Sequence, residues 1–119
     1  MHYIRCLTAF LLAGFAFAAQ AKMVQRPVEW TLGGTRFHSV LVYDDASSAK
    51  RPGLVMVPNW FGVNAEAIRK AQMIAGKDYV ILLTDMYGAN VRPQLDNDAQ
   101  AQAAVKPLYA DRALMRARI

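Results

Sequence analysis

Few residues in this 119-residue chain could carry covalent chemistry, and their spacing does not form a catalytic set. A serine nucleophile needs a base close by, and in many hydrolases it lies on a sharp turn of the type Gly-x-Ser-x-Gly. Ser39 has apolar residues two positions away on both sides, while Ser47 and Ser48 lie in a polar segment without glycine at those positions. We interpret His38, next to Ser39, as an exposed strand residue and not as a catalytic base.

Metal and nucleotide chemistry have no better support. The only cysteine, Cys6, and His2 lie near the N-terminus, and His38 alone cannot assemble a zinc site of the usual kind. The acidic run Asp96-Asn97-Asp98 lacks the remaining positions of a calcium-binding loop, and no glycine-rich phosphate motif occurs. The sequence therefore predicts no metal and no cofactor.

Residues 1–21 have the three-part pattern of a secretory signal peptide. A cationic start precedes an apolar segment over residues 6–19, and Ala19-Gln20-Ala21 ends in small residues. The apolar segment is shorter than the roughly 20 residues that cross a bilayer, so a retained membrane anchor is the weaker interpretation. We expect cleavage after Ala21 and a mature domain of residues 22–119, exported to the periplasm or secreted, with no membrane contact.

The charge of the mature domain does not favour a nucleic-acid partner. Without Arg5, 13 of the 14 basic side chains remain against 9 acidic ones, and the resulting net charge of +4 is spread along the chain. A nucleic-acid surface would gather basic residues beside aromatic ones. The one local cluster, Arg112, Arg116 and Arg118, is more simply a solvated helix face. The mature domain also lacks cysteine, which excludes a disulfide framework.

Alternating apolar and polar residues predict two strands at 28–32 and 36–43, and Gly33-Gly34 between them is a hairpin signal. A polar loop over residues 44–52 follows. Residues 53–57 are then uninterruptedly apolar, which is typical of a parallel strand that is covered on both faces.

A helix is predicted at residues 65–75, with Asn64 as its N-cap and Gly76 beyond its end. Residues at helical spacing are expected to lie on the sheet: Ile68, Ala71, Ile74 and Ala75. Residues 79–83 form a second apolar strand, so 53–83 is predicted to be a βαβ unit.

Two further helices are expected at residues 96–105 and 110–119, interrupted at Pro107. An antiparallel hairpin followed by a βαβ unit is how α/β-hydrolase domains begin. Many other α/β folds share these parts, so the fold class alone does not assign a function.

Two motifs resemble the dienelactone hydrolase family of the α/β-hydrolase superfamily. Residues 51–64 resemble a strand and the loop after it, which in the family typically reads His-Glu-aromatic/aliphatic-Phe/Trp-Gly-Leu-Asn. Residues 76–80 and 84–88 resemble the family's Gly-Tyr-x-Val strand that ends in Pro-Asp-Leu-Tyr-Gly. The similarity covers about residues 50–119 and implies the N-terminal part of an α/β-hydrolase fold, ending before the nucleophile.

The resemblance also implies roles for the loop at residues 58–61. By its position in the motif, the backbone N–H of Trp60 would help to hold a tetrahedral oxyanion, and Asn59 and Phe61 would line the substrate pocket. Asn59 stands where the family has its active-site glutamate, and Pro58 stands where it has a histidine. An amide cannot take up a proton as a carboxylate can, which argues against a mechanism that relies on that charge.

Several of these side chains also have structural interpretations. Trp60 and Phe61 could equally be packed aromatic residues of a core. Asp85 and Tyr87 are expected to shape the exit of the second apolar strand by bonding the backbone, not to do chemistry.

The resemblance implies hydrolysis of a small-molecule ester or lactone through an acyl-enzyme on a cysteine or serine. The nucleophile, acid and histidine are expected downstream of Ile119, so the 119-residue chain alone is expected to be inactive. The alternative is a small exported binding module with Trp60 and Phe61 on its ligand surface, or the remnant of a decayed hydrolase gene. The strand that carries the nucleophile would normally pair beside one of these apolar strands, so without it we expect an unpaired apolar edge and hence poor solubility or loose packing.

Overall fold

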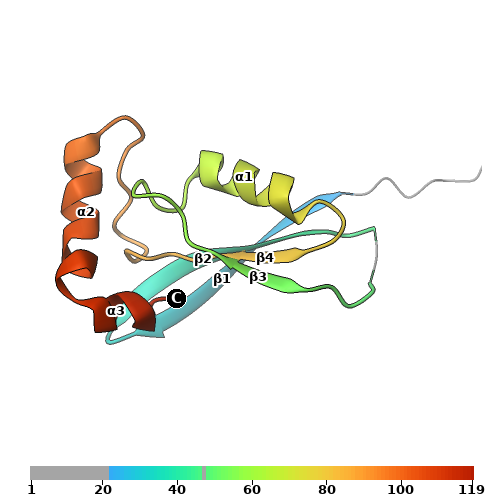
Figure 1. Ribbon diagram of the computed structural model, residues 1–119, viewed down its shortest axis with the longest axis horizontal. Helices are drawn as coiled ribbons and strands as arrows, with labels where there is room; N and C mark the ends of the chain where they lie inside the picture. The colour runs from blue at the N-terminus through green and yellow to red at the C-terminus, as the bar shows by residue number, and fades with distance from the viewer. Residues whose placement is uncertain (1–21, 47) are drawn as a thin grey trace, which may run out of the picture.

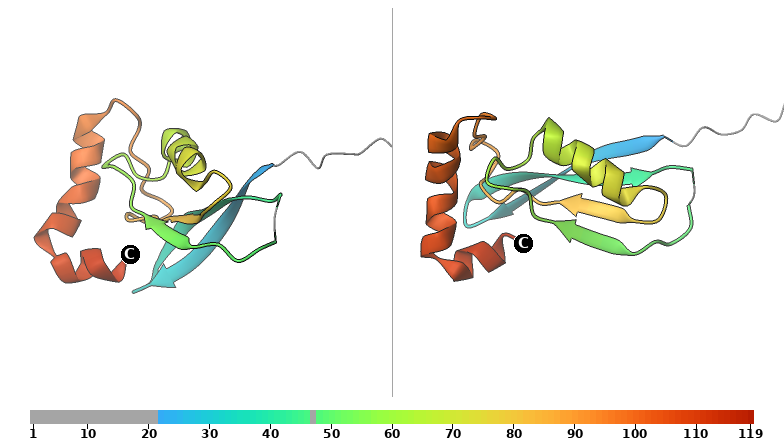
Figure 2. Two further views of the ribbon diagram at one scale, coloured as in Figure 1. Left: turned by 45° about the vertical axis from the view of Figure 1, so that its right-hand side comes forward. Right: turned by 45° about the horizontal axis from the view of Figure 1, so that its top comes forward.

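The computed structural model describes residues 22–46 and 48–119, so the expected signal peptide lies outside the described residues. The chain forms a four-stranded sheet in the order β1-β2-β4-β3. Helix α1 covers one face of this sheet, while α2 and α3 stand at one end of the strands (Figures 1 and 2). No helix in the described part of the chain has the length and apolar character needed to cross a bilayer.

The N-terminal hairpin consists of β1 (Met23–Leu32) and β2 (Thr35–Asp44), which pair antiparallel along their full lengths. Gly33 and Gly34 make the turn with φ of 55° and 77°, values that favour glycine. The predicted hairpin is confirmed, although β1 begins earlier than residue 28. Pro27 does not end β1, because β1 is an edge strand and one missing N–H there can be tolerated.

Strands β3 (Gly53–Met56) and β4 (Val80–Leu83) pair in parallel and, with α1 between them in the chain, form the predicted βαβ unit. The prediction of burial on both faces is wrong for β3, because this strand is at the edge of the sheet and pairs only with β4. Val55 is 54% exposed as a result. In β4, by contrast, Ile81 and Leu83 are buried.

Helix α1 (Ala65–Ala75) begins at the predicted cap, where Oδ1 of Asn64 accepts a hydrogen bond from the N–H of Ala67 at 2.9 Å. Its buried residues are spaced four apart: Ala67, Ala71 and Ala75. The predicted face is therefore wrong for Ile74, which is 51% exposed. Alanine side chains are small and let the helix lie close to the sheet, while the larger apolar side chains of Met73 and Ile74 stay exposed.

Helices α2 (Asp98–Ala110) and α3 (Arg112–Ala117) divide at Asp111, so the predicted interruption at Pro107 is wrong. Pro107 removes only one helical hydrogen bond and lies inside α2. Asp111 has extended backbone angles, and its carboxylate accepts hydrogen bonds from two N–H groups of α3. A new helix therefore begins there because a good N-cap is present, not because proline stops the first.

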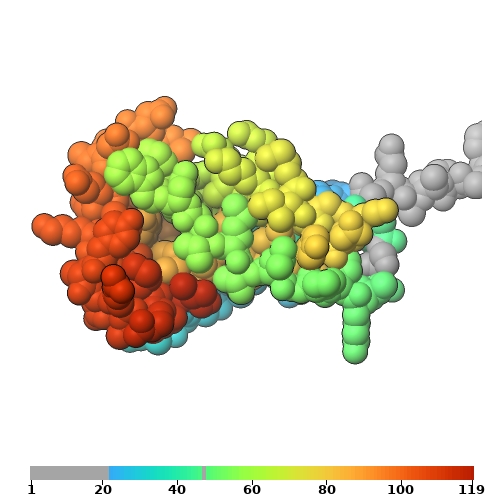
Figure 3. Space-filling model, viewed as in Figure 1, coloured from blue at the N-terminus to red at the C-terminus, as the bar shows by residue number. Residues whose placement is uncertain are grey.

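Two apolar clusters hold these layers together. One lies between α1 and the sheet and contains Val42, Ala71, Ala75 and Ile81. The other joins α2 to the segment after β4 and contains Met86, Tyr87 and Leu108. Figure 3 shows the surface of α2 and α3, in orange to red, meeting the green loop that follows β3. The second cluster thus supports the end of the sheet at which the strands β3 and β4 finish.

Candidate active-site loop

The loops after β3 and β4 leave the same end of the sheet, because these two strands are parallel. In open α/β sheets, ligands bind at this carboxyl end. The loop between Met56 and Ala65 contains the predicted oxyanion residue, Trp60. It is held by contacts from the segment that begins at Thr84, where the N–H donates to the carbonyl of Met56 at 3.0 Å.

The turn at Asn59 fixes the direction of the Trp60 N–H. The N–H of Gly62 donates to the carbonyl of Asn59 at 2.9 Å, and the N–H of Phe61 donates to Oδ1 of the same residue at 3.1 Å. The Asn59 carbonyl and the Trp60 N–H belong to one planar trans peptide, so they point in opposite directions. The Trp60 N–H itself has no hydrogen-bond partner among the described residues.

Tyr87 braces the same turn from the loop after β4. Its hydroxyl donates to the Trp60 carbonyl at 2.9 Å. Burial, with a smaller contribution from Tyr109, raises the pKa of Tyr87, so the hydroxyl stays protonated and remains a donor. Gly62, with φ of 71°, passes so close that a Cβ there would lie 3.2 Å from the Tyr87 ring. Glycine is thus required both for the turn and for this contact.

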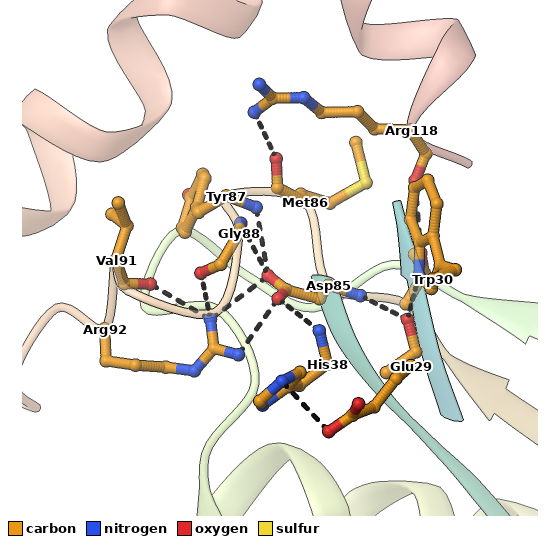
Figure 4. A network of polar contacts seen from close by, with 12 residues as sticks. Glu29, Trp30, His38, Asp85, Met86, Tyr87, Gly88, Val91, Arg92 and Arg118 are labelled. Atoms are coloured by element: carbon orange, nitrogen blue, oxygen red, sulfur yellow. Dashed lines mark hydrogen bonds and ion pairs between the residues drawn. The ribbon is translucent and has the colours of Figure 1, made fainter. Parts of the chain in front are cut away.

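Asp85 organises the backbone of the second loop (Figure 4). Its carboxylate accepts hydrogen bonds from the N–H groups of His38, Tyr87 and Gly88 at 2.9 to 3.1 Å. It also forms a two-point ion pair with the guanidinium of Arg92. Burial alone would raise the pKa of Asp85, but the hydrogen bonds from Arg92 and the backbone outweigh it and lower this pKa below its usual value of 3.8.

Ser39 and His38 in β2 are the serine and histidine that lie next to each other in the sequence, and both have structural partners. Ser39 is buried, and its Oγ accepts hydrogen bonds from Nε1 of Trp30 and from the N–H of Asp85, both at 3.0 Å. The His38 side chain is 39% exposed, and its Nε2 lies 3.2 Å from a Glu29 oxygen, within ion-pair distance but outside hydrogen-bond geometry. Ser39 and His38 point to different partners, so they do not form a nucleophile and base pair.

Two cavities border the Trp60 turn. A cavity of about 240 Å³ is lined mainly by apolar side chains of α2, α3 and the two loops: Val57, Pro58, Asn59, Trp60, Met86, Tyr87, Val105, Leu108, Tyr109 and Met115. A more open one of about 730 Å³ lies between Trp60 and α2. Phe61 lines neither of them and packs edge-on against Trp60, with ring centroids 5.6 Å apart.

Of the three predicted site residues, the oxyanion residue Trp60 and the pocket residue Asn59 border one cavity together with Tyr87, and the pocket residue Phe61 does not. The structural interpretation of Asp85 and Tyr87 agrees with the hydrogen bonds that both make to the backbone. Arg92 is the member of this network that sequence reasoning missed. Its position seven residues after a buried aspartate was the only signal, and that spacing is not specific. Among the described residues, no cluster of three potential metal ligands occurs.

The sheet order, the parallel βαβ unit and the braced loop at its carboxyl end define the N-terminal part of an α/β-hydrolase fold. The model of the dienelactone hydrolase family matches residues 37–118. The chain belongs to the dienelactone hydrolase family, as the two sequence motifs predicted.

Solved structures agree with this assignment. One is a dienelactone hydrolase-like promiscuous phosphotriesterase, P91, from metagenomic libraries, at 32% identity and a TM-score of 0.71 over 81% of this chain. Another, m3DLH, is 30% identical with a TM-score of 0.67 over 81% of the chain. This chain covers 39% and 40% of those two structures. No curated protein matches it.

Proposed function

We propose that this chain supplies the oxyanion-binding loop of a hydrolase that acts on a small-molecule ester or lactone through an acyl-enzyme. The observation that carries the proposal is the Trp60 N–H, which has no partner among the described residues and lies at the carboxyl end of the parallel strands. A fixed N–H donor of this kind stabilises the negative oxygen of a tetrahedral intermediate without reorganising during the reaction. The nucleophile, acid and histidine would come from the region after Ile119.

The rigidity of the turn supports this role. The peptides on both sides of Trp60 are fixed, one by Gly62 through the Asn59 carbonyl and the other by Tyr87 through the Trp60 carbonyl. Preorganised donors stabilise a transition state better than mobile ones, because the cost of ordering them is met on folding. Tyr87 and Gly62 are therefore proposed as positioning residues for the oxyanion donor.

Asn59 is proposed to shape the turn and the pocket and not to carry a proton. Its Oδ1 accepts a hydrogen bond from the Phe61 N–H, which orders the turn, and the residue borders the 240 Å³ cavity. Since an amide has no accessible acid–base equilibrium, proton transfer would depend wholly on residues outside the described part of the chain. The apolar lining of the cavity favours an uncharged acyl group.

Two variants of the protein encoded by the full reading frame test the oxyanion role. Trp60→Pro removes the N–H, and Trp60→Ala removes the indole but keeps the N–H. We expect Trp60→Pro to lower kcat for p-nitrophenyl acetate roughly 100-fold, the usual cost of losing one oxyanion donor, with Trp60→Ala changing mainly KM. Equal losses of kcat in both variants would refute the role of the N–H. A phosphotriester substrate belongs in the same assay, because P91 is a phosphotriesterase.

The coding sequence after Ile119 tests the remainder of the proposal. We expect an in-frame Gly-x-Cys-x-Gly or Gly-x-Ser-x-Gly turn followed by an acid and then a histidine. The 119-residue chain alone should hydrolyse p-nitrophenyl esters no faster than its denatured control.

We also propose that residues 1–21 direct export, so a tagged protein should appear in the periplasm or medium, and deletion of these residues should retain it in the cytoplasm.

A non-enzymatic binding module is the second candidate, and the open cavity beside Trp60 favours it. Trp60 is 39% exposed and Tyr109 is 71% exposed, and both border the 730 Å³ cavity. Exposed aromatic residues at a hollow can bind apolar ligands without catalysis. A stop codon directly after Ile119 would favour this candidate or a decayed gene, whereas a continuation through a nucleophile turn would exclude both.

A further inference from the structure

A third cavity, of about 510 Å³, lies between the β1–β2 turn and the loop after β4, and its lining is basic. The residues around it include two arginines and no acidic residue: Gly34, Thr35, Arg36, Tyr87, Gly88, Ala89, Asn90, Val91 and Arg118. We propose that this cavity binds a small anion, a phosphate or carboxylate group, between the guanidinium groups of Arg36 and Arg118. Neither the family assignment nor the proposed oxyanion loop accounts for two arginines here.

The backbone of Arg36 is fixed, while its guanidinium has no partner among the described residues. Its carbonyl accepts a hydrogen bond from the N–H of Ala89 at 2.8 Å, which ties β2 to the loop after β4. Its exposed side chain has no hydrogen-bond or ion-pair partner among the described residues. A guanidinium offers paired N–H donors that match the oxygens of a phosphate or carboxylate, so Arg36 can close on an anion without breaking an existing contact.

Arg118, the C-cap residue of α3, is the second arginine that lines this cavity. Its Nη1 donates to the Met86 carbonyl at 2.8 Å (Figure 4). Its guanidinium also lies over the Phe37 ring, 5.1 Å from the centroid. Its own carbonyl accepts a hydrogen bond from Oγ1 of Thr84 at 3.1 Å. No carboxylate pairs with this guanidinium among the described residues, and its Nη2 makes no hydrogen bond there. The positive charge is thus positioned but not neutralised.

The nearby carboxylate of Asp85 does not neutralise the pair, because it is already occupied. It accepts three backbone hydrogen bonds and both ends of the Arg92 guanidinium. Two positive side chains that face one hollow repel each other, and an anion between them would turn this repulsion into attraction. The uncompensated charge of Arg36 and Arg118 is therefore the physical basis of the proposed site.

Gly88 lets the two walls of the cavity approach each other. Gly34 and Gly88 have φ of 77° and 106°, and a Cβ on Gly88 would lie 2.9 Å from Cγ2 of Thr35. A side chain at Gly88 would separate the turn from the loop, whereas a Cβ on Gly34 would meet no atom within 4 Å, so Gly34 matters only for its positive φ. The cavity suits an anion of a few heavy atoms together with water, and its chemistry does not distinguish a phosphate from a dicarboxylate.

Isothermal titration of the 119-residue chain with inorganic phosphate, and separately with succinate, tests the site. Arg36→Gln is the main variant, because Arg36 is exposed and its side chain makes no contact that folding needs. Arg26→Gln is the matched control: it lies on β1 of the same hairpin, is also exposed, and removes the same charge. We expect saturable binding of at least one anion, weakened at least tenfold by Arg36→Gln and less than twofold by Arg26→Gln.

The two titrations decide which anion the site takes, and the variants decide whether it exists. Tighter binding of phosphate assigns a phosphate site, and tighter binding of succinate assigns a carboxylate site. Equal weakening by both variants would show attraction to net charge only and would overturn the proposal. Absence of saturable binding by either anion up to 10 mM, roughly the limit of a physiologically useful site, would overturn it as well. These readouts do not depend on ester hydrolysis, so they stand apart from the proposed function.

Discussion

Asp85 and Arg92 form a bidentate ion pair in which Nη2 lies 2.9 Å from Oδ2 and Nη1 lies 3.1 Å from Oδ1. The same Nη1 donates to the Gly88 carbonyl at 2.7 Å, so one guanidinium closes the loop between the two residues. The carboxylate also receives the His38 N–H from β2. This pair therefore joins the strand exit to the sheet and supports Tyr87, which braces the Trp60 turn.

Replacing Asp85 with asparagine should destabilise the protein strongly. Asp85 is 1% exposed, and the change would leave the Arg92 charge without its partner and place an amide N–H₂ among N–H donors. Asp85 is the buried partner of a half-exposed arginine, and it also accepts three backbone hydrogen bonds. Losing the charge of such a carboxylate costs up to several kcal/mol, and we expect a loss of roughly 2 to 3 kcal/mol in the free energy of unfolding by urea. Asp45→Asn, at an exposed carboxylate that accepts the Lys22 N–H, should change it by less than about 0.5 kcal/mol.

The same carboxylate should make stability depend on acid pH. Its pKa is lowered on folding, so its contribution is complete above the usual value of 3.8 and is lost as the pH falls toward the lower folded value. We expect the difference in unfolding free energy between the wild type and Asp85→Asn to be constant from pH 7 to 5 and to shrink below pH 4. Parallel curves down to pH 3 would mean that Asp85 does not titrate differently in the folded state.

The sequence predicts correctly those turns, caps and strands that depend on residues close to one another in the chain. The turn at Gly33-Gly34, the cap at Asn64 and the apolar run of β4 each depend on neighbours within a few positions. The break between α2 and α3 was misplaced because Pro107 was given more weight than the capping carboxylate of Asp111. Both residues can end a helix, and which of them sets the boundary between α2 and α3 depends on their relative effects in the folded chain.

The remaining errors concern long-range partners. The apolar run of β3 predicts a strand, but its burial depends on which strands lie beside it, and it has one neighbour here. The site shows the same limit: Trp60 was found through a local motif, whereas the bond from Tyr87 joins residues 27 positions apart. Likewise, the approach of Arg118 to Phe37 depends on how α3 packs, which no spacing in the sequence encodes.

Loss of the α1 cap should destabilise the layer that covers the sheet. Oδ1 of Asn64 accepts the Ala67 N–H at 2.9 Å, and Asn64→Ala would leave that N–H without this acceptor. We expect a loss of about 1 kcal/mol in the free energy of unfolding, measured by urea titration. Asn64→Asp keeps an acceptor at the positive end of the helix and should remain within about 0.5 kcal/mol of the wild type. An equal loss in both variants would show that the side-chain amide, and not the cap, is what matters.

The edge strand β3 should drive self-association of the 119-residue chain. It pairs on one side only, and Leu54 and Val55 are 39% and 54% exposed, so its free backbone groups and apolar side chains can pair with a second molecule. We expect Val55→Lys to lower the oligomer fraction in sedimentation velocity at least twofold, because a charge on an edge strand opposes such pairing. Ala99→Lys adds the same charge on an exposed position of α2 and is the control. If both lysines lower the oligomer fraction equally, net charge is the cause and the β3 edge is not the contact.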